Sequence, residues 1–112
     1  MERSNDFVYL CEESELHELK GKRFYVNDTD IAIFRIGEKI FAVSNVCPHQ
    51  QAEKIFEGFV EDECVVCPLH GWKFNLIDGK LANGGRGLKT YPVKTFEGKI
   101  YAKVVKKQLN WL

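Results

Sequence analysis

The sequence contains no long apolar run. Its longest stretch without a charged residue, Ile40 to Ala52, has thirteen residues, whereas a membrane-spanning helix needs about 20 mostly apolar residues. The first residues are charged and no apolar segment follows them, so a secretory signal peptide is not expected either. These absences predict a cytoplasmic protein without a membrane anchor.

Net charge is absent as well, because 16 Lys and Arg residues balance 16 Asp and Glu residues. A general nucleic-acid binder carries an excess of basic residues, so no nucleic-acid partner is expected. The chain has 112 residues, and one domain has roughly 100 to 200 residues. We therefore expect a single domain over residues 1–112.

Helical periodicity is scarce, and the one candidate helix is Glu12 to Lys20, which Gly21 would end. Short runs rich in Val, Ile, Phe and Tyr dominate instead, with turn signals of Gly, Asn and Asp between them. Many short strands at close spacing are typical of an all-β sandwich or barrel. The predicted strands are Phe7–Leu10, Arg23–Val26, Ile31–Ile36, Lys39–Val43, Phe59–Val60, Cys64–Val66, Trp72–Leu76, Leu88–Thr95 and Lys99–Val105.

Histidine is rare, and two of the three histidines lie in a stretch, Asn45 to Gly71, that interrupts the pattern of strands. The same stretch holds three of the four cysteines. In a protein without an export signal, such cysteines favour thiol, metal or redox chemistry over disulfide bonds. Because reactive groups often lie on loops that a rigid scaffold holds, we expect the functional site in this stretch.

Two pairs of potential metal ligands stand out. One residue separates Cys47 from His49, and two residues separate Cys67 from His70. Such short spacers keep each thiol and imidazole within reach of one small centre, so two facing loops would supply four ligands. The set fits a tetrahedral zinc site. It also fits a [2Fe–2S] cluster in which two cysteines bind one iron and two histidines bind the other, and the four residues alone leave both possibilities open.

The residues around these ligands favour the cluster. The motifs read Cys-Pro-His and Cys-Pro-Leu-His-Gly-Trp, and with them the sequence resembles the Rieske iron–sulfur family. The likeness is to the small Rieske-type ferredoxins, and also to nitrite reductase small subunits and the Rieske domains of ring-hydroxylating oxygenases. The segments Phe41–Val46, Glu57–Val60 and Leu88–Val93 extend the resemblance over nearly the whole chain.

The resemblance implies an all-β fold, a Rieske-type antiparallel β-sandwich with an inserted cluster-binding subdomain at about residues 45–76. It implies one [2Fe–2S] cluster. It also implies the roles of four residues: the cofactor-binding and metal-ligating residues would be Cys47, His49, Cys67 and His70.

An electron carrier is the function that the resemblance implies. The sequence has no Gly-x-Gly-x-x-Gly dinucleotide fingerprint, and only His17 is left over for the second iron site of an oxygenase. We therefore expect no enzyme but a one-electron carrier, which takes electrons from a flavin-dependent reductase and passes them to a terminal oxygenase. The alternative is the small Rieske subunit of an NAD(P)H-dependent nitrite reductase, and a zinc-binding interaction module is a third possibility.

Two positions bear on the reduction potential. In high-potential respiratory members of the family, a Ser and a Tyr that correspond to Trp72 and Phe74 donate hydrogen bonds to sulfur. A disulfide in those members joins residues that correspond to Ala52 and Leu69. This chain has neither the hydroxyls nor the disulfide, so we expect a potential near the low end of the Rieske range, about −150 mV.

Gln51 departs from the family pattern, because most members have a glycine there. Glycine tolerates a positive φ, so the loop around Gln51 is expected to differ in shape. Cys11 and Cys64 are expected to pack in the core as small apolar residues, and His17 to lie in solvent. The residues expected to form an apolar rim for a small, weak partner contact are Pro48, Leu69 and Trp72.

Overall fold

The computed structural model describes residues 7–48, 52–68, 71–81 and 87–104. These residues form β-strands and two single-turn 3-10 helices, η1 (Glu13–Glu15) and η2 (Ile55–Glu57). No helix among them is long and apolar enough to cross a membrane. The predicted all-β class is confirmed. The strands are β1 (Phe7–Glu12), β2 (Gly21–Val26), β3 (Thr29–Ile36), β4 (Lys39–Ser44), β5 (Phe59–Glu61), β6 (Cys64–Val66), β7 (Lys73–Asn75), β8 (Thr90–Tyr91), β9 (Val93–Phe96) and β10 (Lys99–Lys103).

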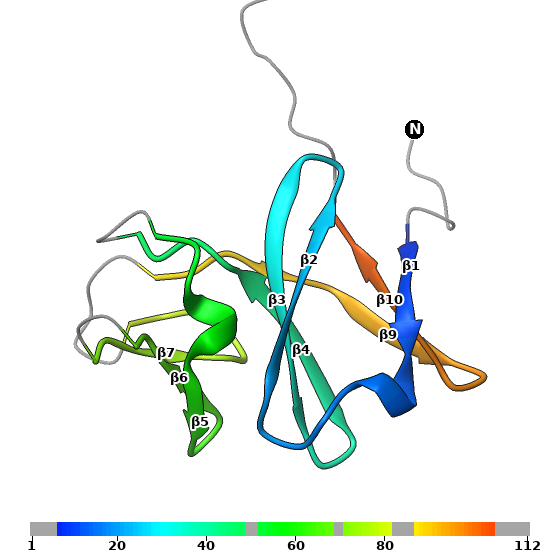
Figure 1. The fold of residues 1–112 in the computed structure, drawn as a ribbon, viewed down its shortest axis with the longest axis horizontal. Helices are drawn as coiled ribbons and strands as arrows, with labels where there is room; N and C mark the ends of the chain where they lie inside the picture. The colour runs from blue at the N-terminus through cyan, green and yellow to red at the C-terminus, as the bar shows by residue number, and fades with distance from the viewer. Residues whose placement is uncertain (1–6, 49–51, 69–70, 82–86, 105–112) are drawn as a thin grey trace, which may run out of the picture.

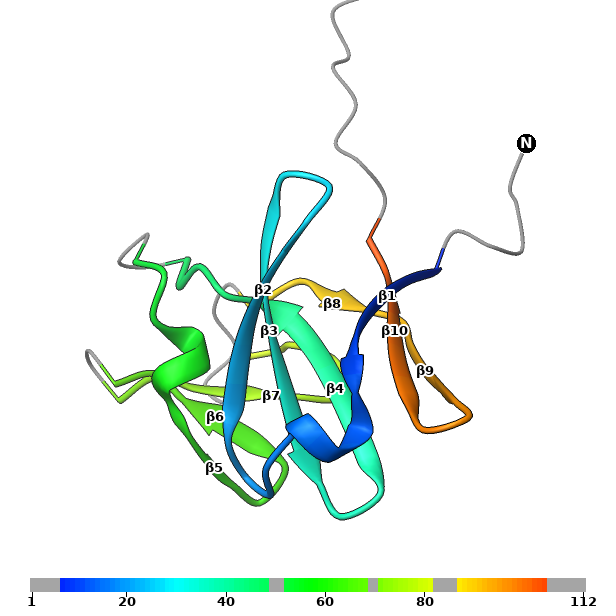
Figure 2. The same ribbon diagram turned by 45° about the vertical axis from the view of Figure 1, so that its right-hand side comes forward.

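The strands form three antiparallel sheets that stand side by side (Figures 1 and 2). The central sheet has the strand order β2-β3-β4-β8. The sheet β1-β10-β9, which contains the first and last strands, lies on one side of it. The small sheet β5-β6-β7 lies on the other side and comes entirely from the chain between β4 and β8.

Two hydrophobic cores lie on opposite faces of the central sheet. Because side chains alternate along a strand, Ile31 and Ile33 of β3 belong to one core, and Ala32 and Phe34 belong to the other. All four residues are fully buried, which explains why this part of β3 is an unbroken apolar run. We call the core with Ile31 the base core and the core with Phe34 the loop core. The loop core consists of Ala32, Phe34, Val43, Cys47, Ile55, Val65, Cys67, Phe74, Leu76, Leu81 and Leu88.

Tight turns connect the long hairpins where the sequence predicts them. Asn27 and Asp28 both have a positive φ, 51° and 63°, and join β2 to β3. Two consecutive residues of this kind match the right-handed twist of the strands, and Asn and Asp tolerate the conformation. Glu97 and Gly98 make the same kind of turn between β9 and β10.

The candidate helix at Glu12–Lys20 forms only in small part. Only Glu13–Glu15 is helical, as η1, and the next residue, Leu16, is extended and buried. The guanidinium of Arg35 donates hydrogen bonds to the backbone carbonyls of Glu13 (3.1 Å) and Leu16 (3.3 Å). These contacts with β3 satisfy carbonyls that a longer helix would use within itself, so tertiary structure outweighs helix propensity here.

The predicted strand Leu88–Thr95 is divided at Pro92. Before it, β8 pairs with β4 in the central sheet, and after it β9 pairs with β10. Proline has no N–H to donate to a ladder, and the carbonyl of Pro92 accepts a hydrogen bond from Lys103 (2.9 Å). The chain thus passes from one sheet to the other at this residue and links the two halves of the sandwich.

Candidate metal centre

Two loops carry the predicted ligands. The first loop, residues 47–52, lies between β4 and η2, and the second loop, residues 67–72, joins β6 to β7. The described parts of both loops lie at the same end of the molecule, at the left of Figure 1. Cys47 and Cys67 are the first residues of the two loops, whereas His49, Gln51 and His70 lie outside the described residues.

Matching hydrogen bonds close both loops. The N–H of Cys47 donates to the carbonyl of Ala52 (2.9 Å), and the N–H of Cys67 donates to the carbonyl of Trp72 (2.8 Å). In the second loop, the N–H of Gly71 also donates to the carbonyl of Cys67 (3.0 Å). Gly71 has a φ of +71°, a conformation that residues with side chains rarely adopt. Each loop therefore runs from a cysteine to its hydrogen-bonded partner five places later.

Cys47 and Cys67 are buried residues outside any disulfide. Cys47 is 0% exposed and Cys67 is 1% exposed, and neither forms a disulfide. Both belong to the loop core, in which Phe74 and Ile55 also lie. A buried thiolate without a compensating positive charge is strongly unfavourable, whereas a bound metal deprotonates its thiol ligand outright. Two buried thiols at the start of matching loops therefore fit the cysteine half of a Rieske donor set.

The described residues supply only these two potential ligands to the centre. No group of three or more His, Cys, Asp or Glu residues that could hold a metal ion occurs within them. The assignment of His49 and His70 therefore stays a prediction. Of the predicted rim, Pro48 and Trp72 are half-buried, and Leu69 lies outside the described residues.

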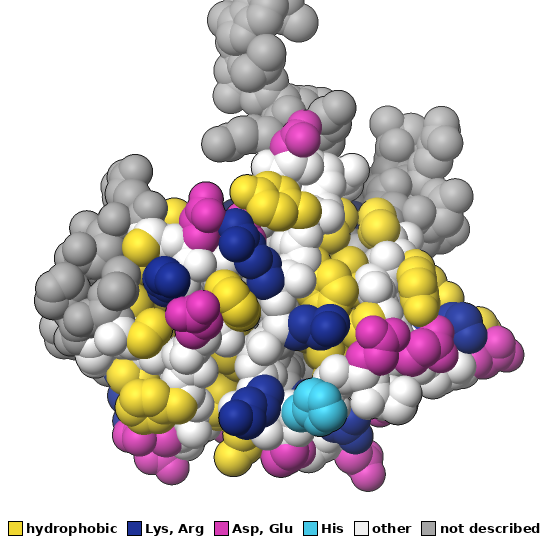
Figure 3. Space-filling model, in the orientation of Figure 1, with side chains coloured by type: hydrophobic (Ala, Val, Ile, Leu, Met, Phe, Trp, Pro, Cys, Tyr) yellow, Lys and Arg dark blue, Asp and Glu magenta, His cyan; other side chains and the backbone are white. Residues whose placement is uncertain are grey.

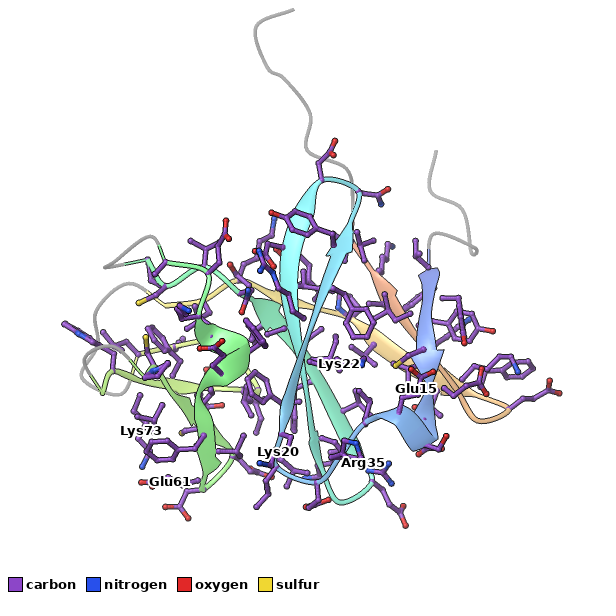
Figure 4. All side chains as sticks on the ribbon, viewed as in Figure 1. Glu15, Lys20, Lys22, Arg35, Glu61 and Lys73 are labelled. Atoms are coloured by element: carbon purple, nitrogen blue, oxygen red, sulfur yellow. The ribbon has the colours of Figure 1, made fainter. Side chains whose placement is uncertain are left out.

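Cys64 lies on the opposite face of its sheet from the loop core. Val65 beside it belongs to that core, and alternation along β6 turns Cys64 the other way. Cys64 is half-buried, and burial raises the pKa of its thiol, which favours the protonated form. An ion pair between Lys73 and Glu61 (3.2 Å) lies on the same outer face (Figure 4). The expected core position of Cys64 is therefore wrong, and this orientation gives no support to a metal or redox pair with Cys67.

The two other residues outside the loops are where the sequence predicts them. Cys11 is 3% exposed and belongs to the base core, where burial raises the pKa of its thiol. His17 is exposed to solvent. Neither residue lies in the loop core, so both are separate from the candidate centre.

Asn45, two residues before Cys47, is fully buried and joins the two ends of the first loop. Its side-chain Nδ2 donates to Oδ1 of Asp30 (3.1 Å), and its Oδ1 accepts a hydrogen bond from the N–H of Phe56 (2.7 Å). Its backbone N–H donates to the carbonyl of Asp30 (2.9 Å), and its carbonyl accepts from the N–H of Ile55 (3.2 Å). These hydrogen bonds tie the chain before the first loop to β3 and to η2.

Asp30 is 8% exposed and brings a negative charge to this arrangement. Arg23 of β2 donates from Nε to Oδ1 of Asp30 (3.0 Å) and from Nη2 to Oδ2 (2.7 Å), and it also binds Glu53 in the chain after the first loop (2.8 Å). The hydrogen bond to Asp30 is the main cause of a raised pKa of the Arg23 guanidinium. We call Glu53, Arg23, Asp30 and Asn45 the polar circuit. Among the described residues, no buried side-chain nitrogen or oxygen lacks a hydrogen-bond partner.

The sequence offers only weak signs of the polar circuit. Asp30 stands directly before an apolar run, and Asn45 stands between another apolar run and Cys47. Buried polar groups are usually hydrogen-bonded, but the sequence does not reveal their partners. Arg23 reaches Asp30 from a neighbouring strand, and only the pairing of β2 with β3 brings the two side chains together.

The charged side chains on the face shown in Figure 3 are mixed. Basic and acidic groups alternate across it, and no broad field of one sign appears on this face. A nucleic-acid surface would present a basic patch or stripe. This face therefore gives no support to a nucleic-acid partner.

Comparisons with known proteins cover most of the chain. A family model described as a Rieske-like [2Fe-2S] domain matches residues 6–103. The 3-phenylpropionate/cinnamic acid dioxygenase ferredoxin subunit of Photorhabdus laumondii is 38% identical over 104 residues, which cover 90% of this chain and 97% of that protein.

Solved structures give the same result. A protein described as an NADH-dependent nitrite reductase small subunit, from Mycobacterium tuberculosis, superimposes with a TM-score of 0.83 at 27% identity, over 88% of this chain and 95% of the other. A chain from a complex of reduced oxygenase and oxidised ferredoxin in carbazole 1,9a-dioxygenase gives a TM-score of 0.77 at 26% identity, over 85% and 99%. The similarity therefore extends over the sandwich as well as the cysteine loops.

Proposed function

From the premise that this chain belongs to the Rieske-like [2Fe-2S] family, we propose that Cys47 and Cys67 bind one iron of its cluster and that His49 and His70 bind the other. The observation that carries this assignment is the pair of buried cysteines, neither in a disulfide, at the start of two loops with matching closure. The chain carries one cluster, which supplies one-electron transfer when bound. The loop core keeps water from the two thiolates, because both cysteines are enclosed by apolar side chains.

The chain is a Rieske-type protein of the kind that includes oxygenase ferredoxins and nitrite reductase small subunits. Within this kind, our proposal is a free ferredoxin that takes electrons from a flavin-dependent reductase and passes them to a terminal oxygenase. The dioxygenase ferredoxin subunit supports this role, because it is 38% identical and 97% of its length is covered. The similarity to a chain from an oxygenase–ferredoxin complex agrees with it.

A second candidate is the small subunit of an NAD(P)H-dependent nitrite reductase. The structural match to such a subunit, with a TM-score of 0.83, favours it. Both roles need the same cluster, so they differ in the partner and in the lifetime of the complex. A free ferredoxin makes small, short-lived contacts, whereas a fixed subunit needs a larger interface.

Other expectations belong to the same proposal. Residues 1–112 would form one domain, in which residues of about 45–76 are the cluster-binding subdomain, and the protein would act in the cytoplasm as a carrier rather than an enzyme. Pro48 and Trp72, both half-buried beside the loops, would contribute the apolar part of the partner contact.

Metal analysis after anaerobic purification tests the ligand set. A Rieske cluster predicts about two irons and about two acid-labile sulfides per chain, and the loss of both in Cys67→Ser. The matched control is Cys64→Ser, three residues away on the outer face, which should keep them. Zinc at about one ion per chain, without sulfide, would support the zinc module instead.

Reconstitution with partners tests the function. The reduced protein should re-oxidise rapidly when mixed with a terminal Rieske oxygenase in the presence of its substrate, and slowly with a sirohaem nitrite reductase subunit. The reverse order of rates, or co-purification with a nitrite reductase at a fixed ratio, would favour the second candidate. Wild-type protein from which the metal has been removed is the control for electron transfer to the partner that does not pass through the cluster.

A further inference from the structure

The two loops differ in how their ends are held. The second loop continues directly from β6 into β7, and these strands pair in antiparallel register with Val66 opposite Lys73. The first loop has no such frame. β4 ends at Ser44 and pairs with β3 and β8, and the chain after the loop enters η2 instead of a strand.

At the first loop, the polar circuit does what the pairing of β6 with β7 does at the second loop. Asn45 binds Ile55 and Phe56 across the base of the first loop. It also fixes this base to Asp30 of the central sheet. Arg23 then connects Asp30 to Glu53, so that the circuit begins before the loop and returns to the chain after it.

The buried members of the circuit depend on one another. Asn45 is 0% exposed and Asp30 is 8% exposed, and both use their side-chain groups within the circuit. When one partner of a buried hydrogen bond is removed, the other is left unsatisfied, because neither water nor another protein group can take the lost partner's place. The ion pair with Arg23 compensates the charge of Asp30, so the carboxylate can stay near the loop core without a large cost.

We propose that Asn45, Asp30 and Arg23 are positioning residues for the cluster, which hold the base of the first loop and with it the thiol of Cys47. This inference rests on the ligand assignment proposed above. In this role they act through Cys47 and do not themselves bind the cluster. They hold Cys47 in place, while the β6–β7 ladder holds Cys67.

The test compares Asn45→Leu with Ile33→Ala. Leucine is close to asparagine in size but makes no hydrogen bond, so this variant breaks the circuit at its centre. Ile33 is fully buried on β3 in the base core, on the face away from the loops, so its loss destabilises the fold without touching the circuit. The measurements are the urea midpoint, the rate at which a chelator removes iron, and the EPR spectrum of the reduced cluster.

Asn45→Leu should lose iron about tenfold faster than wild type, the change expected from one unsatisfied buried group, and its EPR spectrum should broaden. Ile33→Ala should lower the urea midpoint at least as much, yet keep the wild-type spectrum. If Asn45→Leu does not fold, Arg23→Met serves, because it cuts the circuit at a partly exposed residue. Equal iron loss in the Asn45 and Ile33 variants, or a wild-type spectrum in Asn45→Leu and Arg23→Met, would overturn the inference alone. A wild type without an iron–sulfur cluster would overturn the ligand assignment, and this inference with it.

Discussion

The first and second loops present the same hydrogen-bonded closure but stand on different supports. The second loop is the end of a hairpin, in which apolar residues such as Val65 and Phe74 are fully buried. The first loop is held by Asn45 and a partly buried ion pair. A hydrophobic ladder tolerates small changes because apolar contacts are non-directional. A polar circuit tolerates few changes at its buried members, because each of them needs its partner in place.

The difference matters for a centre that needs both loops. A cluster held by both loops, as proposed, keeps its geometry only if the less tolerant loop keeps its own shape. We therefore expect substitutions near the first loop to change the cluster before they unfold the domain. Substitutions in the β6–β7 hairpin that supports the second loop should unfold the domain and release the cluster together.

The largest effect is expected from the ligands. Cys47→Ser, Cys67→Ser, His49→Ala and His70→Ala should each abolish the visible absorption of the cluster and its acid-labile sulfide, because in the proposed ligand set each would remove a bond to iron. Absorption spectra and sulfide analysis of the anaerobically purified variants check this.

Two other cysteines provide controls for the ligand variants. Cys11→Ser and Cys64→Ser should retain the full absorption, although the buried hydroxyl of the Cys11 variant should cost about 1 kcal/mol of stability or more. Loss of the cluster in Cys64→Ser, or its retention in a ligand variant, would show that the four ligands are wrongly assigned.

The next largest effect concerns the support of the second loop. Phe74 is fully buried in the loop core, so Phe74→Ala should lower the free energy of unfolding by about 3–5 kcal/mol. Urea titrations monitored by circular dichroism and by cluster absorption should then show coincident transitions. Loss of absorption well before loss of β-structure would mean that the second loop, like the first, has a support that is separate from the fold.

A smaller effect is expected on the reduction potential. Wild type should lie near about −150 mV, the low end of the Rieske range. The double variant Trp72→Ser/Phe74→Tyr should raise the potential by about 40 mV for each new hydrogen bond of about 1 kcal/mol, because such a bond stabilises the added negative charge of the reduced state. Voltammetry of a protein film measures both values.

The single variant Phe74→Tyr keeps the half-buried Trp72 in place and should give part of the increase. A wild-type potential above zero, or an unchanged potential in a double variant that retains its cluster, would contradict this account of the two positions.

The smallest effects should come from two exposed ion pairs, one beside each loop. Glu53→Gln removes the contact with Arg23, and Glu61→Gln removes the contact with Lys73. Exposed ion pairs contribute little and are screened by salt. Both variants should have urea midpoints close to wild type, and any difference should vanish at high salt. A marked loss in Glu53→Gln alone would mean that the exposed member of the polar circuit stabilises the fold as its buried members do.

Much of the fold could be predicted from the sequence because strands of two-residue periodicity leave clear patterns. β3 and β4 were predictable from their apolar runs, and the turn at Asn27 and Asp28 from its residue types. The helix at Glu12–Lys20 could not be excluded from its sequence, because Arg35, a distant residue, binds the carbonyls that would extend it.

The metal centre shows the same limit. Cys47 and Cys67 stand out in the sequence because short ligand motifs are local, and the structure buries both. Their role as ligands stays a prediction. The support of the first loop could not be predicted, since Arg23, Asp30 and Asn45 come from separate segments and meet only through sheet pairing. The prediction for Cys64 failed because a short apolar strand does not show which of its faces is covered.

The most direct test of the proposed centre is pulsed EPR on the reduced protein with its histidines labelled with nitrogen-15. The proposed ligand set predicts hyperfine coupling from two histidine nitrogens, one each from His49 and His70. His17→Gln, in which an exposed histidine outside the centre is replaced, should leave this signal unchanged. A paramagnetic cluster without coupling to histidine nitrogen, or a protein with no paramagnetic centre after reduction, would contradict it.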